Sequence, residues 1–153
     1  MLNTNLFSSE SSEDLLKIRT VSEVMQTKVI HVSPTADLAS IAKIITSENT
    51  DSIVIAQKRL VGARKEVFPL GVIAQRDIEL IQALKQDLGK IQAETVMSRV
   101  FAVHSTDSIC NAYLQMHYSN LQQLIVVGND EELVGIVTLS SCLPVKFSVK
   151  KKL

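Results

Sequence analysis

The sequence has no tryptophan, only 4% aromatic residues and no excess of charge, with 16 basic and 16 acidic residues among 153. A nucleic-acid-binding surface needs a basic excess to neutralise phosphates and aromatic rings to stack on bases, so we expect no nucleic acid as partner. Long apolar runs are missing too; the strongest are Ile53–Ala56 and Leu124–Val127. A membrane span needs about 20 apolar residues, so these runs predict buried strands and no membrane partner.

Cysteine is scarce as well, with only Cys110 and Cys142, and neither belongs to a CxxC pattern. The histidines show no metal-ligand spacing, so we expect reduced thiols, no metal site and a cytoplasmic protein. The polar, acidic start MLNTNLFSSESSEDLL does not have the pattern of a signal peptide. P-loop, GxSxG, HExxH and GxGxxG motifs are absent, and the stretch His104–Asp107 is interpreted as helix capping. The sequence therefore predicts that this protein is not an enzyme.

What the sequence does contain is an internal repeat. The pair Val24-Met25 recurs as Val96-Met97. One helical apolar pattern occurs twice with an offset of 71 residues, at Leu38, Ile41, Ala42 and Ile45 and at Ile109, Ala112, Tyr113 and Met116. The offset then falls to 64, at Gly71-Val72-Ile73 and Gly135-Ile136-Val137, so the first copy carries seven more residues in its hairpin. Each copy predicts the order strand, helix, strand, turn, strand, helix.

The helix that closes each copy differs in length. The first is predicted over residues 78–88, with Ile81, Leu84 and Leu88 on one face and Gly89 as its stop. In the second copy Pro144 follows closely, which limits the helix to about one turn.

This order of elements, with Val-Met at each start and Gly-apolar-apolar near each end, resembles the CBS domain, and the tandem resembles the CBS pair called a Bateman module. The resemblance implies an α/β (α+β) fold of two strand-helix-strand-strand-helix repeats packed about a pseudo-twofold axis. We expect an N-terminal lead-in over 1–19, partly flexible, repeat 1 over 20–89, repeat 2 over 90–145 and a basic tail over 146–153.

In the family the binding element reads Gly, two apolar residues, Thr or Ser, two residues, then Asp. A strand ends there and a helix begins, so free backbone N–H groups attract phosphate, while the Asp can hold a ribose diol. The first copy has Arg76 and Asp77, with Ala74 in the hydroxyl position. The second keeps Thr138 but has Ser141 in place of the Asp. Because hydrogen bonds to a carboxylate are stronger than neutral ones, we expect the first cleft to bind better.

The resemblance also places the adenine ring against residues just before the first strand of each unit. These are Val29 and Ile30 for the first cleft and Val100 and Phe101 for the second. Each candidate has a plainer interpretation: Asp77 and Ser141 as helix caps, Arg76 as a solvated side chain, and the four apolar residues as core.

Two functions follow from the resemblance. The first is a regulatory CBS pair that binds an adenosine-type ligand (AMP, ADP, ATP or S-adenosylmethionine) and transmits its level to a fused or separate effector through dimer geometry, with no tightly bound cofactor. The alternative is a ligand-free dimerisation or scaffold module whose clefts have degenerated at Ala74 and Ser141. Apolar residues such as Leu80 and Leu84 predict a homodimer.

The longer hairpin is basic, with four Lys and Arg residues against Glu66. It is interpreted either as a contact for a partner or a polyphosphate tail, or as a soluble loop tip.

Overall fold

The computed structural model describes residues 19–143. Residues 1–18 and 144–153 lie outside the described part, and with them the expectations for a partly flexible lead-in and a basic tail. The chain divides into two compact units, one formed by Met1–Lys28 and Phe101–Leu153 and the other by Val29–Val100. They are called unit 1 and unit 2 below, and each is described by itself. Within residues 19–143 no helix has the length and apolar character needed to cross a membrane.

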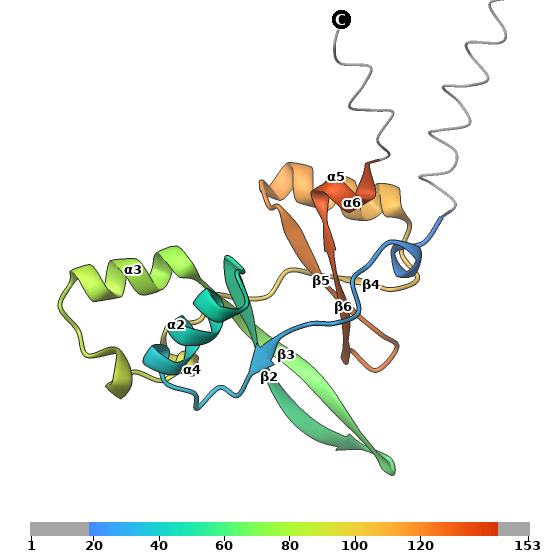
Figure 1. The fold of residues 1–153 in the computed structure, drawn as a ribbon. Helices are drawn as coiled ribbons and strands as arrows, with labels where there is room; N and C mark the ends of the chain where they lie inside the picture. Colours follow the sequence, from blue (N-terminus) through green and yellow to red (C-terminus); the bar gives the residue numbers. More distant parts are fainter. Residues whose placement is uncertain (1–18, 144–153) are drawn as a thin grey trace, which may run out of the picture. The chain divides into compact units, whose positions relative to one another are not determined.

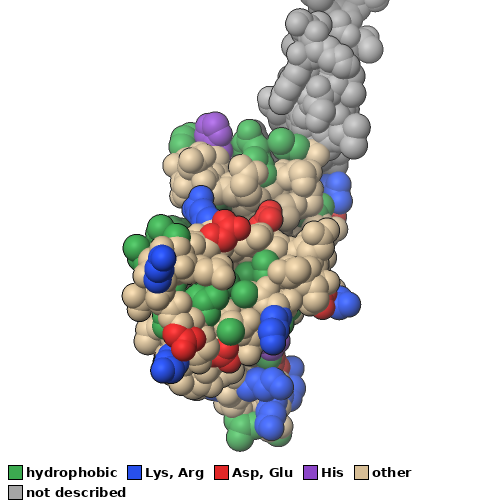
Figure 2. Space-filling view, turned by 60° about the vertical axis from the view of Figure 1, so that its left-hand side comes forward, with side chains coloured by type: hydrophobic (Ala, Val, Ile, Leu, Met, Phe, Trp, Pro, Cys, Tyr) green, Lys and Arg blue, Asp and Glu red, His purple; other side chains and the backbone are tan. Residues whose placement is uncertain are grey.

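Unit 2 holds a three-stranded sheet in the order β1-β2-β3, with β1 parallel to β2 and β2 antiparallel to β3 (Figure 1). Its elements are β1 (His31–Val32), α2 (Leu38–Ser47), β2 (Ser52–Val61), β3 (Arg64–Ala74), α3 (Gln75–Ala83), η2 (Leu88–Lys90) and α4 (Ala93–Val96). The hairpin of β2 and β3 extends well past the sheet, and its turn begins with Gly62 at φ 64°. Figure 2 shows Lys and Arg side chains gathered at the lower end of the molecule, over this hairpin.

Unit 1 repeats this arrangement with the sheet order β4-β5-β6. Its elements are η1 (Val21–Glu23), β4 (Ala102–His104), α5 (Ile109–Ser119), β5 (Gln123–Val127), β6 (Leu133–Thr138) and α6 (Leu139–Cys142). The pairing repeats residue by residue: His31 lies opposite Val54 in unit 2, and Ala102 lies opposite Ile125 in unit 1. The predicted order of elements is therefore confirmed in both copies.

Both antiparallel pairs contain an irregularity at the equivalent place. The register shifts directly after Ile55, which lies opposite Gly71, and directly after Val126, which lies opposite Gly135. A bulge of this kind bends the strand and increases its twist. The seven additional residues of the first copy lie beyond the bulge, so they lengthen the hairpin and leave the register of the sheet unchanged.

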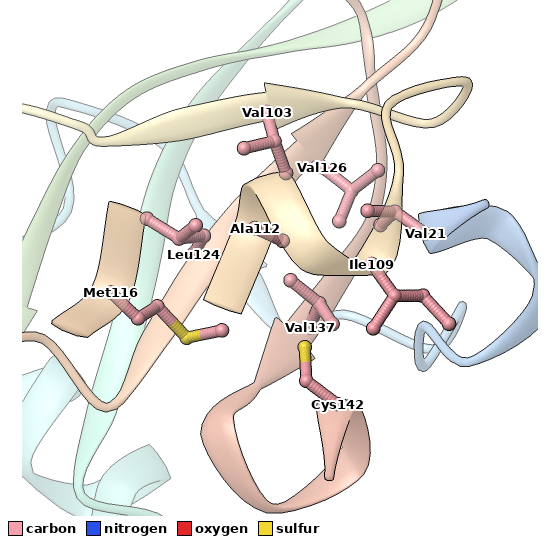
Figure 3. Packing of buried hydrophobic residues seen from close by; sticks show 9 residues of the cluster. All are labelled: Val21, Val103, Ile109, Ala112, Met116, Leu124, Val126, Val137 and Cys142. Carbon is pink, nitrogen blue, oxygen red and sulfur yellow. The ribbon is translucent and has the colours of Figure 1, made fainter. Parts of the chain in front are cut away.

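The predicted helical faces lie in the cores. In unit 2, Leu38, Ile41 and Ile45 of α2 are buried against sheet residues such as Ile55 and Ile73. In unit 1 the corresponding face of α5 packs on β4, β5 and β6, as Figure 3 shows. This cluster consists of Val21, Val103, Ile109, Ala112, Met116, Leu124, Val126, Val137 and Cys142. Cys142 is a core residue, and its burial raises the pKa of the thiol to about 11.

The start of each sequence repeat packs on the sheet of the other repeat. Gln26 exchanges two backbone hydrogen bonds with Ile136 of β6, at 2.8 and 2.9 Å. Ser98 exchanges two with Val72 of β3, at 3.0 and 2.9 Å. The compact units and the sequence repeats therefore divide the chain differently.

The closing helices differ in length as predicted, but one prediction about the first was wrong. The helix α3 ends at Ala83, and Lys85 then adopts the left-handed conformation with φ 62°. Leu88 belongs to the separate turn η2 and packs on the core, whereas Leu84 is 64% exposed. The apolar pattern continued across a break that Lys85, and not Gly89, introduces. The second helix, α6, is a single turn.

Candidate functional site

The first candidate site is formed by Val29, Ile30, Ala74, Arg76 and Asp77, all in unit 2. Its centre is the junction of β3 and α3, where the helix begins without an intervening loop. The N–H of Gln75 donates to the carbonyl of Asp51 at 2.8 Å, which fixes the first helical residue to the residue before β2. The start of α3 is thus held at one end of the sheet.

Asp77 is the third residue of α3, not its N-cap as the sequence suggested. Its Oδ2 accepts a hydrogen bond from the N–H of Ala74 at 3.1 Å, and the side chain is half-buried. A carboxylate in this position caps the helix from inside its first turn and also interacts favourably with the helix dipole. The other oxygen, Oδ1, is not part of this cap. The capping interpretation and a ligand role are therefore compatible at Asp77.

Ala74 occupies the N-cap position of α3 and has no side-chain acceptor. Consequently, no side chain caps the N–H groups of the first turn, as a Thr or Ser at this position could do. Arg76, the second residue of the helix, is exposed and forms no ion pair with another residue in the described part. Uncapped N–H groups, a helix dipole and a guanidinium all favour an anion at this end of α3.

The second candidate site is satisfied internally. Thr138 Oγ1 accepts from the N–H of Ser141 at 3.2 Å, and Ser141 Oγ in turn accepts from the N–H of Thr138 at 3.2 Å. The Ser141 hydroxyl also donates to the Thr138 carbonyl at 2.9 Å. This is a complete capping box on α6, a helix of only four residues. The alternative interpretation of Ser141 as a cap is the one that this geometry favours.

The apolar candidates differ in how they are placed. The carbonyl of Ile30 accepts from Val54 N–H at 3.4 Å and its side chain packs against the core of unit 2, whereas Val29 is half-buried and outside that core. Phe101 repeats the backbone contact of Ile30, accepting from Ile125 N–H at 3.0 Å, and is 40% exposed. Val100 is the last residue of unit 2 and Phe101 the first described after it in unit 1.

The register brings the parts of the first site to the same end of one sheet. Ser52 pairs with Ala74 across β2 and β3, and β1 pairs with β2 from His31 onward. The carbonyl of Ile30 continues this pairing, because it accepts from the N–H of Val54. The structure therefore places Ile30, Ala74 and the start of α3 at the same end of one sheet.

Sequence reasoning missed the reason for the glycine in each binding element. A Cβ added to Gly71 would lie 2.5 Å from Sδ of Met97, and one added to Gly135 would lie 2.8 Å from Sδ of Met25. Each glycine thus accommodates the methionine from the Val-Met pair that begins the other repeat. The sequence contains a signal for this contact, because the Val-Met pair and the Gly-apolar-apolar motif each occur twice. No local pattern, however, connects one motif with the other.

The stretch His104–Asp107 forms a turn. Asp107 Oδ2 accepts from the N–H of His104 at 2.9 Å, and the N-cap of α5 is Ser108, so the expected capping role belongs to the next residue. The ring of His104 contacts the carboxylate of Glu131 at 2.6 Å, and this carboxylate raises the pKa of His104. Both side chains are exposed.

Comparison with known proteins agrees with this fold. The family model described as CBS domain matches residues 21–63 and 93–145, more than half of the chain. Among solved structures, a CBS domain protein from Pyrobaculum aerophilum complexed with AMP is similar, with a TM-score of 0.70 and 21% identity over 86% of this chain and 97% of that chain. A search of curated proteins found no match.

Two further structures show the same fold. The CBS domain pair of protein MJ0100, in complex with 5′-methylthioadenosine and S-adenosyl-L-methionine, has a TM-score of 0.67 and 21% identity, over 89% of this chain and 99% of that one. The CBS domain of the bacterial CNNM/CorC family Mg2+ transporter in complex with ATP has a TM-score of 0.71 and 14% identity, over 87% and 90% of the two chains.

Proposed function

Because this chain belongs to the CBS domain family, we propose that it is a regulatory module that binds an adenosine-type ligand at the junction of β3 and α3. The proposed ligand class is AMP, ADP, ATP or S-adenosylmethionine. Solved relatives of the same fold hold AMP, ATP, or S-adenosyl-L-methionine with 5′-methylthioadenosine, which supports this class. The module has no catalytic role in this proposal.

The single observation that carries the proposal is the difference between the starts of α3 and α6. In α6 the Thr138 hydroxyl accepts from the Ser141 N–H, and the Ser141 hydroxyl accepts from the Thr138 N–H. In α3 the alanine at position 74 leaves those N–H groups without a side-chain cap, and a carboxylate stands at position 77. The first site therefore offers N–H groups without a side-chain cap to a phosphate and a carboxylate to a ribose diol, whereas the hydroxyls of the second site are engaged in its own cap and it has no carboxylate.

Each residue of the first site has a role in this proposal. Asp77 keeps Oδ2 on the Ala74 N–H and offers Oδ1 to the ribose hydroxyls. Arg76 and the first-turn N–H groups of α3 interact with phosphate or another anionic group. Val29 contributes apolar contact for the adenine ring, while Ile30 chiefly supports the core.

Ligand binding transmits a signal only if two states of the protein bind the ligand with different affinity. We place the two states in the geometry of a homodimer, which then controls a fused or separate effector. The exposed residues Leu80 of α3 and Leu84, the C-cap directly after it, are 62% and 64% accessible. Such an apolar surface is self-complementary in a twofold dimer and would be covered there.

Titration of the four ligands into the wild type and two variants tests the proposal. Asn at position 77 can still accept from the Ala74 N–H, so Asp77→Asn preserves the helix start and removes only the charge. Hydrogen bonds to a charged group are worth about 1.5–3 kcal/mol, so affinity for the bound ligand should fall roughly tenfold to a hundredfold. The matched control Ser141→Ala should leave this affinity unchanged.

The outcomes separate the two candidate functions. A ligand at a hundred times its Kd should stabilise the wild type by about 2.7 kcal/mol, which appears as a rise in melting temperature. If none of the four ligands raises the melting temperature, the ligand-free scaffold is the better supported function. The start of α6, where the Thr138 and Ser141 side chains cap the helix, favours that function. If a ligand binds equally to the wild type and Asp77→Asn, Asp77 is only a cap.

A further inference from the structure

The β2–β3 hairpin is the part of unit 2 that the proposed function does not use. It carries seven residues more than the β5–β6 hairpin, all beyond the bulge. Its outer part is basic, with Lys58, Arg59, Arg64 and Lys65 against Glu66. A hairpin that projects past its sheet and carries a net positive charge can contact a partner.

The strand register sorts these charges onto two faces of the ribbon. Arg59 lies opposite Glu66, and Val61 lies opposite Arg64. On this face both arginines have partners: Arg59 lies 4.2 Å from the centroid of the Phe68 ring, and Arg64 Nη1 lies 3.8 Å from Glu66 Oε1. Both guanidinium groups on this face therefore interact with side chains of the hairpin itself.

The other face carries Lys58 opposite Val67 and Leu60 opposite Lys65. We call these four residues the lysine face. It contains no acidic residue, and Leu60 is 68% exposed between the two lysines. Cations and apolar groups alternate along and across the two strands. Only every second side chain of a strand added beside the ribbon lies on this face, so the pattern matches a segment whose acidic and apolar residues alternate at every second position.

The edges of the ribbon are open beside this face. In residues 19–143, β1 pairs with Val54 and Ile55 of β2, and Ser98 pairs with Val72 of β3, so no described strand flanks the outer hairpin. An open edge can accept another strand through its backbone groups.

We propose that the lysine face binds an extended acidic segment of a partner protein, which adds to the hairpin as a strand. Charge complementarity supplies the attraction and Leu60 an apolar contact. Nucleic acid fits less well, because the whole chain has no net charge and the one aromatic ring of the hairpin, Phe68, is buried under Arg59.

A labelled peptide that repeats Glu-Thr-Val-Thr is the probe, because its Glu and Val side chains then share one face of an extended strand; a Gln-Thr-Val-Thr peptide of the same length is its control. Fluorescence anisotropy with the full chain at low salt should show binding of the acidic peptide only. Lys58→Gln with Lys65→Gln should weaken binding about tenfold, since two exposed charge pairs are each worth up to about 1 kcal/mol. Leu60→Ser should weaken it as well.

Arg59→Gln with Arg64→Gln is the matched control, because it removes the same charge from the opposite face and should change affinity less than about twofold. Unchanged melting curves establish that each variant is folded. Equal losses in both pairs would mean general attraction to a basic surface and overturn the proposal. No binding up to about 1 mM peptide would also overturn it, leaving the lysines as protection of an open edge. Tighter binding of single-stranded DNA or anionic vesicles would do the same.

Discussion

Replacing Gly71 with alanine tests the packing of Met97, from the second repeat, on the glycine of the first repeat. The new methyl carbon would lie 2.5 Å from Sδ, 2.6 Å from Cγ and 2.9 Å from Cβ of Met97. Non-bonded carbon atoms are at their best separation at about 3.5–4.0 Å, so Met97 must move. A rotamer change of Met97 cannot move its Cβ. The backbone there is held as well, because the next residue, Ser98, exchanges two backbone hydrogen bonds with Val72. We therefore expect a loss of about 2 kcal/mol in the free energy of unfolding, within the roughly 1–3 kcal/mol of overpacked cores.

A double-mutant cycle isolates the contact. Met97→Ala removes Sδ and Cγ but leaves Cβ, so it relieves most of the clash at the cost of its own lost packing. The double variant should be more stable than the sum of the single changes by about 1 kcal/mol. Urea unfolding followed by circular dichroism measures all four proteins.

Gly89→Ala is the control, because its Cβ would meet only Asp87 Oδ1, at 3.4 Å. It should change stability by about 0.5 kcal/mol or less. The reasoning is refuted if Gly71→Ala is no more destabilising than Gly89→Ala, or if the changes at Gly71 and Met97 are additive within about 0.5 kcal/mol.

Three further predictions concern the core, an ion pair and the dimer. Ile45→Asp places a charge where the side chain is 3% exposed, so it should cost several kcal/mol, and near-native melting would contradict the helix placement. Glu131 raises the pKa of His104 above its ordinary 6.5, so this pair stabilises the protein fully below that value and the gain is lost as pH rises through the folded pKa. Glu131→Gln should therefore lower the His104 pKa in an NMR titration and reduce stability at pH 5.5 but not at pH 9, where an equal loss would rule out the pair as its cause. Leu80→Glu with Leu84→Glu should turn a dimer into a 16.9 kDa monomer in sedimentation, and a wild type that is monomeric at micromolar concentration would remove the dimer from the proposal.

The fold was accessible from the sequence because its signals are local and occur twice. The helical period of Leu38, Ile41 and Ile45 and the short apolar runs each report burial on one face of one element. A constant offset between two copies then adds information that no single motif contains. The same local reading failed at Lys85, because a left-handed residue interrupts the helix without changing its apolar period.

The candidate site divides in the same way. The sequence by itself determined that the first site has a carboxylate at Asp77 but no hydroxyl at Ala74. It also determined that the second site has a hydroxyl at Thr138 but no carboxylate at Ser141. Whether Asp77 is the N-cap or the third residue of α3 depends on where this helix begins. The backbone hydrogen bond from Gln75 to Asp51, which is distant in sequence, fixes the first residue of the helix. Only the tertiary structure placed Met97 on Gly71 and Met25 on Gly135, since chain crossing between repeats is a long-range property that local sequence patterns do not encode.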